Sequence, residues 1–399
     1  MTSNTCDFRL NYMKIGIDAR TILNPEKGDA IGAGHYAYQL ISHLLELDKE
    51  NEYVLFFDFR VREKDVKKFT RPNVKIKFYP FSDYKRYLPG AYSEILGTAT
   101  LQKEKLDIIH STSPLSRIPI GYRGKCVVTF NDMSLYVCSD CFPRVKSARD
   151  RIVFSLMAKK ADKIITVSES VKSDLQKFLN VAPEKTEVIY SGIDKRFFVN
   201  PAEDSRKILE KFNIRGKYIL FLGTLEPAKN ITRLLHAFAN FKEKYKNYHG
   251  KKFEYQLVLA GKRGWLAKEY HYEIRNFGLQ KEVVFTGYII GDELVPLFKN
   301  SEFFVMPSLC EGFGMTVLEA FATGTPAIVS KVTSMPEIAG EAAYFVSPIS
   351  VEEISDAMFK FATDDNLRNS FRSKGLEQAK KFDWKKTAEK TLEIYKNLK

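Results

Sequence analysis

The chain has 399 residues, of which 44% are hydrophobic and 28% are charged, as in an ordinary globular protein. No apolar run reaches the ~18 residues of a membrane-spanning helix, and the N-terminal segment lacks the apolar core of a signal peptide, so we expect a cytoplasmic protein. The net charge of +13 indicates a surface that attracts phosphate groups, but no nucleic-acid-binding motif accompanies it, and we expect no nucleic-acid partner.

Short β-rich runs alternate with amphipathic stretches along the chain. We predict a first series of strands at residues 14–19, 52–57, 74–79, 106–111, 126–131, 162–168 and 186–192. A second series follows at residues 218–223, 255–261, 282–287, 301–307 and 326–330. Continuous apolar strands between helices are typical of parallel sheets that are covered on both faces.

Two such series predict an α/β protein with two doubly wound, Rossmann-like domains. The polar stretch near residues 200–206 marks the boundary, so we predict one domain at 1–200 and a second at 201–380. An amphipathic helix at 381–399 ends the chain, and we expect it to return to the first domain. In such folds the ligand lies at the carboxyl ends of the strands.

Five cysteines are scattered along the chain, at positions 6, 126, 138, 141 and 310. An odd number fits free thiols in a reducing compartment. Cys138 and Cys141 form a C-x-x-C pair, but a second pair with zinc spacing is missing. We therefore favour ordinary loop thiols over a zinc site or a redox site.

The segment LCEGFGMTVLEAFATGTPAIVS, residues 309–330, carries two glutamates, Glu311 and Glu319. A glycine-bracketed turn, Gly312–Gly314, separates a buried strand from a helical run that Gly324 ends. Such a turn directs backbone N–H groups and the positive end of a helix at one point, which is how proteins bind phosphate.

A carboxylate accepts two hydrogen bonds well, and vicinal hydroxyl groups supply two donors. The simplest ligand with a phosphate and diols on either side of it is a nucleotide sugar. The alternative is a capping or ion-paired arrangement around an ordinary turn.

This segment resembles the E-x7-E signature of the family 4 retaining glycosyltransferases, which have the GT-B fold. Further counterparts occur in the same order through most of the chain, among them KIGIDAR, IGAGHYAYQL, ITVSESVKSDL, GTLEPAKN and LVLAGKRGW. The run GTLEPAKN is most similar to the branch that transfers mannose and related hexoses.

The resemblance implies roles for the residues of the E-x7-E segment. Glu311 would bind hydroxyl groups of the transferred sugar, and Glu319 would bind the ribose. Gly312, Phe313 and Gly314 would offer backbone N–H groups to the sugar and its phosphates.

It also implies roles elsewhere in the chain. Lys229 would meet the diphosphate leaving group, as a compact positive charge suits developing negative charge. Gly32 and Gly34 would close over the diphosphate from the other domain, and Tyr288 would lie near the base. Thr224 and Lys262 would lie near the donor as well.

Two departures from the family pattern stand out. The family often has His-Asp where this chain has Asn131 and Asp132, beside the transferred sugar, and asparagine carries no charge near neutrality. It also often has arginines where this chain has Thr224 and Ala228. Lys262 and Arg263 are the candidates to compensate in binding the diphosphate.

We expect no cofactor and no catalytic metal. No D-x-D triplet occurs in the chain, and Lys229 with the helix dipole would supply the positive field. His110 ends a predicted strand, and we favour a core histidine over one that faces the cleft.

Residues 142–163 combine seven basic side chains with apolar ones, which is the pattern of a segment that contacts anionic lipid. The alternative, which we favour, is a surface helix that packs its apolar stripe on the sheet. The aromatic stretch at 84–92 is a candidate lining for an acceptor groove.

The sequence thus predicts a cytoplasmic retaining glycosyltransferase, working in solution or at the inner membrane surface. It would move a hexose, mannose as the first choice, from a nucleoside diphosphate sugar such as GDP-mannose to a saccharide or lipid-linked saccharide. The alternatives are a UDP-sugar-using transferase of the same fold, a GT-B phosphorylase or epimerase, and a catalytically silent module that binds sugar nucleotide or lipid.

Overall fold

The computed structural model describes residues 12–23, 32–79, 90–199, 205–250, 253–262, 264, 267–289 and 291–399. The chain divides into two compact units. The first unit comprises Met1–Thr129, Leu156–Ile164 and Ala388–Lys399, and the second comprises Phe130–Ser155 and Ile165–Thr387.

A seven-stranded sheet forms from the first series of strands, in the order β3-β2-β1-β4-β5-β6-β7. The pairs with described register, β1 with β2 and β4, β2 with β3, and β4 with β5, are parallel. The strands are β1 (Lys14–Asp18), β2 (Glu52–Asp58), β3 (Val74–Tyr79), β4 (Ile108–Ser111), β5 (Lys125–Phe130), β6 (Lys163–Thr166) and β7 (Thr186–Val188). Every strand predicted in this part of the chain is therefore present.

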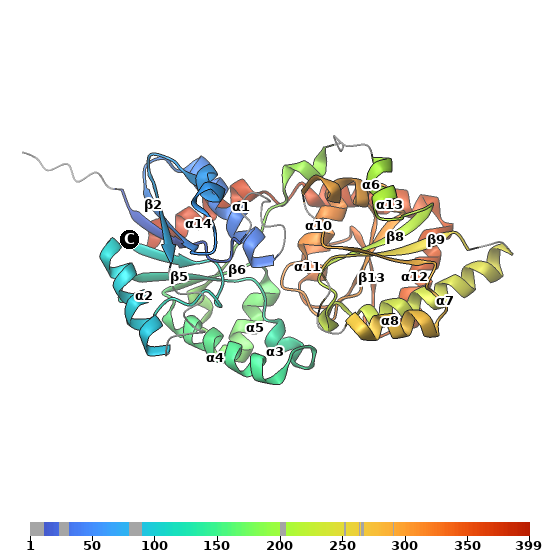
Figure 1. The fold of residues 1–399 in the computed structure, drawn as a ribbon, viewed down its shortest axis with the longest axis horizontal. Helices are drawn as coiled ribbons and strands as arrows, with labels where there is room; N and C mark the ends of the chain where they lie inside the picture. The colour runs from blue at the N-terminus through green and yellow to red at the C-terminus, as the bar shows by residue number, and fades with distance from the viewer. Residues whose placement is uncertain are drawn as a thin grey trace, which may run out of the picture. The chain divides into compact units, whose positions relative to one another are not determined.

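Helices alternate with these strands. They are α1 (Gly32–Leu47), α2 (Gly90–Glu104), α3 (Ser134–Val137), α4 (Arg144–Lys160) and α5 (Glu169–Leu179). In α1 the apolar side chains Leu40, Leu44 and Leu45 recur at helical spacing, and all three are buried. The α1 helix lies over one face of the first sheet and α2 over the other (Figure 1).

His110 joins the last helix, α14 (Trp384–Leu398), to the core of the first unit. Its ring is fully buried, with Nδ1 2.5 Å from the hydroxyl of Tyr395 and Nε2 2.8 Å from the hydroxyl of Thr129. Burial lowers the pKa of His110 to about 3, so the ring is neutral. His110 is a core histidine, the alternative favoured from the sequence.

A six-stranded sheet forms from the second series, in the order β10-β9-β8-β11-β12-β13, and its pairs are parallel. The strands are β8 (Lys217–Leu222), β9 (Tyr255–Ala260), β10 (Val283–Gly287), β11 (Phe303–Met306), β12 (Ala327–Ser330) and β13 (Ala343–Val346). The sequence analysis missed β13, because a run of four residues at the edge of a sheet gives too short a signal.

Two helical layers cover this sheet, with α10 and α13 on one face and α7, α8 and α12 on the other (Figure 1). The helices of this part of the chain are α6 (Ser205–Lys211), α7 (Ile231–His249), α8 (Ala267–Asn276), α9 (Leu294–Lys299), α10 (Met315–Ala322), α11 (Met335–Ala339), α12 (Val351–Thr363) and α13 (Asp365–Ala379). The layering is that of a doubly wound fold.

The predicted domain boundary, between residues 200 and 201, lies outside the described residues. The division into 1–200, 201–380 and 381–399 therefore stays a prediction. The two compact units follow a different partition, because they assign residues 130–155 and 165–199 to the same unit as the second sheet.

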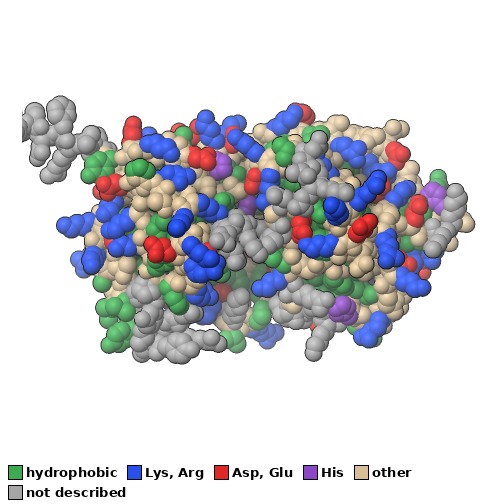
Figure 2. Space-filling view, turned by 45° about the horizontal axis from the view of Figure 1, so that its top comes forward, with side chains coloured by type: hydrophobic (Ala, Val, Ile, Leu, Met, Phe, Trp, Pro, Cys, Tyr) green, Lys and Arg blue, Asp and Glu red, His purple; other side chains and the backbone are tan. Residues whose placement is uncertain are grey.

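Among the described residues, no helix is both long and apolar enough to cross a bilayer. On the face drawn in Figure 2, Lys and Arg side chains are dispersed and interleaved with Asp and Glu. The described residues on that face do not gather Lys and Arg into a single stripe of the kind that follows a nucleic-acid backbone.

Candidate functional site

The order in which strands are added to the second sheet reverses at β8. The chain proceeds from β8 to β9 on one side of it, whereas β11 pairs with β8 on the other side. In open parallel sheets, ligands bind at the carboxyl ends of the strands at such a point. The two segments that leave β8 and β11 there are residues 223–230 and 307–314. They carry the predicted residues Thr224, Lys229 and Glu311 and the turn Gly312–Gly314.

Lys229 is fixed by the residue that follows it. It ends a short 3₁₀ turn, Pro227–Lys229, and Asn230 then adopts a left-handed conformation with φ of +60 before α7 begins. The amide of Asn230 is buried and donates to the carbonyl groups of Pro307, at 3.0 Å, and Pro348, at 2.6 Å. The segment after β8 is thereby tied to the segment after β11.

The structure brings Lys229 and Glu311 together. Nζ of Lys229 donates to Oε1 of Glu311 at 2.6 Å, and the side chains are only 20% and 11% exposed. Burial alone lowers the pKa of Lys229, but the Glu311 carboxylate more than offsets it, so the pKa lies above the ordinary value and the lysine is charged. A partly buried positive charge and a partly buried carboxylate thus lie next to the glycine turn.

Two further groups orient Glu311. The hydroxyl of Ser308 donates to Oε1 of Glu311 at 2.7 Å. The backbone N–H of Glu311 donates to the hydroxyl of Thr333 at 3.0 Å. The sequence analysis missed Ser308, Thr333 and Asn230. The bonds of Thr333 and Asn230 reach across loops that meet only in the folded chain. Ser308 lies in the same loop as Glu311, three residues before it, but no local pattern marks its hydroxyl as a partner.

The glycine turn leads directly into α10, as predicted. Gly314 has φ of +90, and α10 begins at Met315 and ends before Gly324, which has φ of +74. Among the described residues, the backbone N–H groups of Gly312, Phe313 and Gly314 donate to no protein acceptor. Three adjacent free donors at the positive end of a helix form an arrangement that binds an anion.

Asn131 and Asp132 lie against the turn within the second unit. A side chain at Gly312 would place its Cβ 2.0 Å from the carbonyl oxygen of Asn131 and 2.6 Å from the Cβ of Asp132. Glycine is required here because no other residue leaves room for that approach. The hydroxyl of buried Ser168 also donates to the carbonyl of Gly312, at 2.7 Å. The predicted sugar-side residues are therefore next to the predicted phosphate-binding turn.

Glu319 lies on α10 and is only 6% exposed. Among the described residues its carboxyl group has no hydrogen-bonding partner. Burial raises the pKa of Glu319 to about 8, Arg196 opposes this and Asp194 adds to it. A buried carboxyl group without a partner is costly, so this one is better explained by a ligand than by the fold.

The remaining predicted residues have varied positions. Thr224 is partly exposed in the segment after β8, Lys262 is exposed after β9, and Tyr288 is 45% exposed just after β10. The side chain of Phe313 points away from solvent into an aromatic cluster with Tyr190 and Phe382, which leaves only its backbone for a ligand.

The other predicted site residues lie in the first unit or outside the described residues. Gly32, with φ of +58, and Gly34 are at the start of α1 in the first unit, so their place over the diphosphate stays a prediction. Arg263 and most of the aromatic stretch at 84–92 lie outside the described residues.

Within the described part of the chain, no group of three or more His, Cys, Asp or Glu residues is placed to hold a metal ion. The site therefore offers one lysine, three backbone donors and two carboxyl groups. Together these can bind a diphosphate and two sets of hydroxyl groups.

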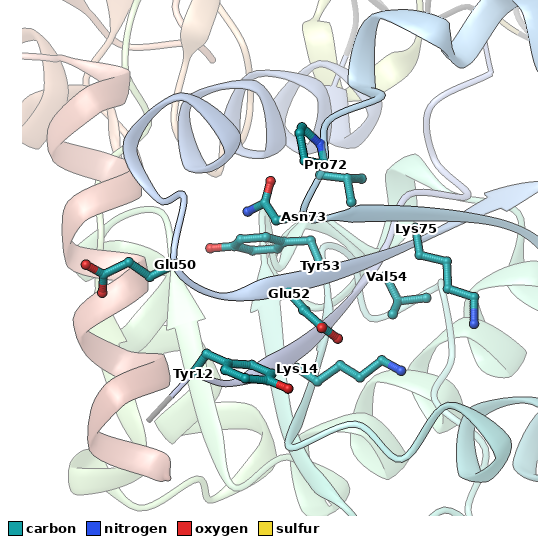
Figure 3. Close-up of a pocket in the computed structure, with 10 residues that line it drawn as sticks. Tyr12, Lys14, Glu50, Glu52, Tyr53, Val54, Pro72, Asn73 and Lys75 are labelled. Atoms are coloured by element: carbon teal, nitrogen blue, oxygen red, sulfur yellow. The ribbon is translucent and has the colours of Figure 1, made fainter. Parts of the chain in front are cut away.

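A cavity of about 530 Å³ lies at the amino ends of strands in the first sheet (Figure 3). Lys14, Glu52 and Val74 begin β1, β2 and β3, so the cavity faces the amino ends of these strands. Lys14 and Lys75, which line it, pair with Glu104. Ligands of parallel sheets bind at the carboxyl ends, so this cavity is not a candidate donor site.

Comparison with known proteins covers most of the chain. The model of the family described as "Glycosyltransferase Family 4" matches residues 31–197, and that of "Glycosyl transferases group 1" matches residues 204–378. The O-antigen chain mannosyltransferase B of Escherichia coli is 30% identical over 277 residues, which are 69% of this chain and 71% of that protein. The serotype-specific mannosyltransferase WbdA of Escherichia coli is 30% identical over 243 residues, and this chain spans only 29% of its length.

Two solved structures show the same fold. The sucrose-phosphate synthase of Thermosynechococcus elongatus matches with a TM-score of 0.76 at 19% identity, over 97% of this chain and 99% of that one. HepE of Anabaena, solved in complex with UDP-glucose, matches with a TM-score of 0.74 at 17% identity, over 97% and 100% of the two chains. At these identities the similarity concerns the fold alone, and it confirms the prediction of two doubly wound α/β domains.

Proposed function

Since this chain belongs to the family 4 and group 1 glycosyltransferases, which have the GT-B fold, we propose that it is a retaining hexosyltransferase that uses a nucleoside diphosphate sugar. The sugar we propose is mannose, with GDP-mannose as the donor. The acceptor would be a saccharide or a lipid-linked saccharide, as the name of the O-antigen chain relative suggests.

The observation that carries the proposal is the buried carboxyl group of Glu319, which has no partner among the described residues. It lies on the helix whose amino end presents the three free N–H groups. A diphosphate at that end would place a ribose diol within reach of Glu319, and the diol would supply the missing hydrogen bonds. This arrangement favours a nucleotide sugar over a ligand without a ribose.

In the proposed reaction, Glu311 holds hydroxyl groups of the transferred sugar, and Asn131 lies beside that sugar. The acceptor hydroxyl attacks the anomeric carbon from the face that the diphosphate leaves, and the departing phosphate oxygen takes the hydroxyl proton. Lys229 and the N–H groups of Gly312–Gly314 stabilise the negative charge that develops on the leaving group. No protein nucleophile and no metal ion is needed for this sequence of steps.

The alternative donor is a UDP-sugar, because the structural neighbour HepE was solved with UDP-glucose. The mannosyltransferase relatives are more similar in sequence, at 30% identity against 17%, and this favours GDP-mannose. The second alternative is a module that binds sugar nucleotide without transferring it, which the replacement of the family histidine by Asn131 leaves open.

Thermal unfolding of the full chain with GDP-mannose, UDP-glucose, UDP-galactose and ADP-glucose tests the donor. We expect the largest rise in Tm with GDP-mannose, because a ligand that binds only the folded state stabilises it. Release of GDP on addition of an acceptor saccharide, unchanged by EDTA, is expected of a transferase without a catalytic metal. A shift with UDP-sugars alone would contradict the donor, and binding without GDP release in any acceptor mixture would support the silent module.

We further propose that the chain works in the cytoplasm against an anionic membrane surface, through one face of α4. Val145 and Ile152 are 87% and 62% exposed, and both lie with exposed Arg149 at the i, i+4, i+7 spacing of one helix face. Only part of the apolar stripe, including Phe154 and Met157, packs inward. An exposed face that mixes apolar and basic side chains fits the surface of a bilayer with anionic lipid.

Sedimentation with vesicles of phosphatidylcholine and phosphatidylglycerol tests this surface. Val145→Gln combined with Ile152→Gln is expected to weaken binding about tenfold, because two apolar side chains no longer enter the interface. Ile349→Gln is the matched control, since Ile349 is an equally exposed apolar residue outside α4, at 70%. Equal binding of the double variant, or equal binding to vesicles of phosphatidylcholine alone, would contradict the proposal.

A further inference from the structure

Three thiols pack together where the segments that carry Lys229 and Glu311 meet. Cys141 and Cys310 form a small buried cluster with Ala228, and Cys138 packs against it. All belong to the second unit, and all three thiols are free. We call Cys138, Cys141 and Cys310 the thiol cluster. The sequence predicted ordinary loop thiols, because it could not show that Cys310 joins a pair lying 169 residues before it.

Cys138 is the member that links the cluster. It packs against the buried part of the cluster, and its proximity contributes to the pKa shifts of both Cys141 and Cys310. Cys138 precedes and Cys141 ends one 3₁₀ turn, Ser139–Cys141, and the N–H of Cys141 donates to the carbonyl of Cys138 at 2.9 Å. Cys138 is partly exposed, whereas Cys141 and Cys310 are 9% and 2% exposed. An oxidant from solvent therefore meets Cys138 first.

The cluster is coupled to the site through the chain itself. Ala228 immediately precedes Lys229, and Cys310 immediately precedes Glu311. The N–H of Leu309 donates to the carbonyl of Ala228 at 2.8 Å, which joins the two segments beneath the ion pair. A displacement of Cys310 must therefore move Glu311.

We propose that the thiol cluster is a site of reversible oxidation, in which a hydroperoxide drives formation of a disulfide between Cys138 and Cys310. Hydrogen peroxide oxidises the Cys138 thiol to a sulfenic acid and is reduced to water. The Cys310 thiol then attacks the Cys138 sulfur, the S–S bond forms, and a second water leaves with the hydroxyl group of the sulfenic acid. Two thiols and one peroxide thus give one disulfide and two waters.

The burial of the second thiol sets the pace of this reaction. The contact with Cys138, together with burial, raises the pKa of Cys310, and burial raises the pKa of Cys141. Because the thiolate is the attacking form, the second step is slow compared with that of an exposed thiol pair. A slow disulfide fits a response to sustained peroxide and not to a brief pulse.

The disulfide would displace the loop that carries Glu311. Sulfur atoms in contact as thiols must approach to about 2.05 Å in a disulfide, with a fixed dihedral preference. A catalytic group misplaced by about 1 Å costs about 100-fold in rate. We therefore expect the oxidised protein to transfer about 10- to 100-fold more slowly, with recovery on addition of dithiothreitol.

Peptide mapping by mass spectrometry tests the disulfide without any assay of activity. The full chain is treated with hydrogen peroxide, the remaining thiols are blocked with N-ethylmaleimide, and a cross-linked peptide that contains Cys138 and Cys310 is expected. A Cys138–Cys141 cross-link alone, an irreversible sulfinic acid at Cys138, or full labelling of every thiol would overturn the proposal.

The effect on transfer rests on the proposed function, whereas the cross-link does not. Cys310→Ser is expected to abolish the loss of transfer under peroxide, measured against its own untreated activity. Cys126→Ser is the matched control, because Cys126 is buried in the first unit outside the thiol cluster and its replacement should leave the peroxide response intact. A wild-type protein that forms the cross-link but transfers no sugar before or after treatment would count against the proposed function, not against the disulfide. Equal sensitivity of Cys310→Ser and wild type would count against the disulfide.

Discussion

Replacement of Lys229 by Met is expected to lower sugar transfer about 100- to 1,000-fold, the loss that follows removal of one donor to a developing anion. Met keeps most of the length and packing of the lysine stem but removes the charge. The diphosphate would leave without its compensating cation, and Glu311 would lose the partner that holds it at 2.6 Å. The measurement is kcat, with KM for the donor determined in parallel.

Lys242→Met is the matched control for this experiment. Lys242 forms an ion pair with Glu282 at the same 2.6 Å, and its side chain is 15% exposed against 20% for Lys229. If both variants lose the same modest amount of stability and only Lys229→Met loses transfer, the effect belongs to the site. Equal transfer by the two variants would remove Lys229 from the proposed mechanism.

Asn131→Ala separates sugar-side contacts from nucleotide contacts in the same assay. Asn131 lies against Gly312, at the sugar end of the predicted site. Its loss should lower kcat and leave the affinity for GDP unchanged, because its bonds would go to the sugar. Weaker binding of GDP with normal kcat would place Asn131 away from the reacting centre.

The fold was predictable from the sequence because continuous apolar strands give a strong signal. Strands such as β11 and β12 are buried along their whole length, and their runs of apolar residues are visible in the sequence. The edge strand β13 was missed, since only two of its four residues are buried. Edge strands carry fewer core contacts, so their sequences are less constrained.

The site was predictable where a local motif holds it and not where distant loops build it. Gly312, Gly314 and Glu319 lie on one turn and one helix, so spacing and the family resemblance located them together. The bond from Glu311 to Thr333 and those from Asn230 to Pro307 and Pro348 depend on how loops after different strands meet. The sequence also placed Lys229 and Glu311 on separate parts of the donor, whereas the structure shows them paired to each other.

Glu319→Gln is expected to weaken GDP binding by at least about tenfold, because a charge-assisted hydrogen bond contributes about 1.5–3 kcal/mol. Gln keeps the size of the side chain, so no cavity forms. In the wild type only the carboxylate accepts two bonds from a ribose diol, and the pKa of Glu319 is raised to about 8 by burial. Affinity should therefore increase as the pH rises towards 8 in the wild type and stay level in Glu319→Gln, as measured by calorimetric titration.

The same substitution should change the stability of the unliganded protein in the opposite direction. With a folded pKa of about 8 against an ordinary value of 4.5, Glu319 holds its proton in the folded state and loses it in the unfolded state between these limits. The folded state then binds more protons, so the free energy of unfolding falls as the pH rises from 4.5 to about 8. Glu319→Gln removes this group's contribution to the pH dependence of stability, and its Tm should exceed that of the wild type by more at pH 8 than at pH 4.5.

Glu341→Gln, at an exposed carboxylate, is the control, and its Tm should differ little from that of the wild type at either pH. Parallel curves for wild type and Glu319→Gln would show that Glu319 is ionised before any ligand arrives, and the fold would then have to supply a partner for that charge.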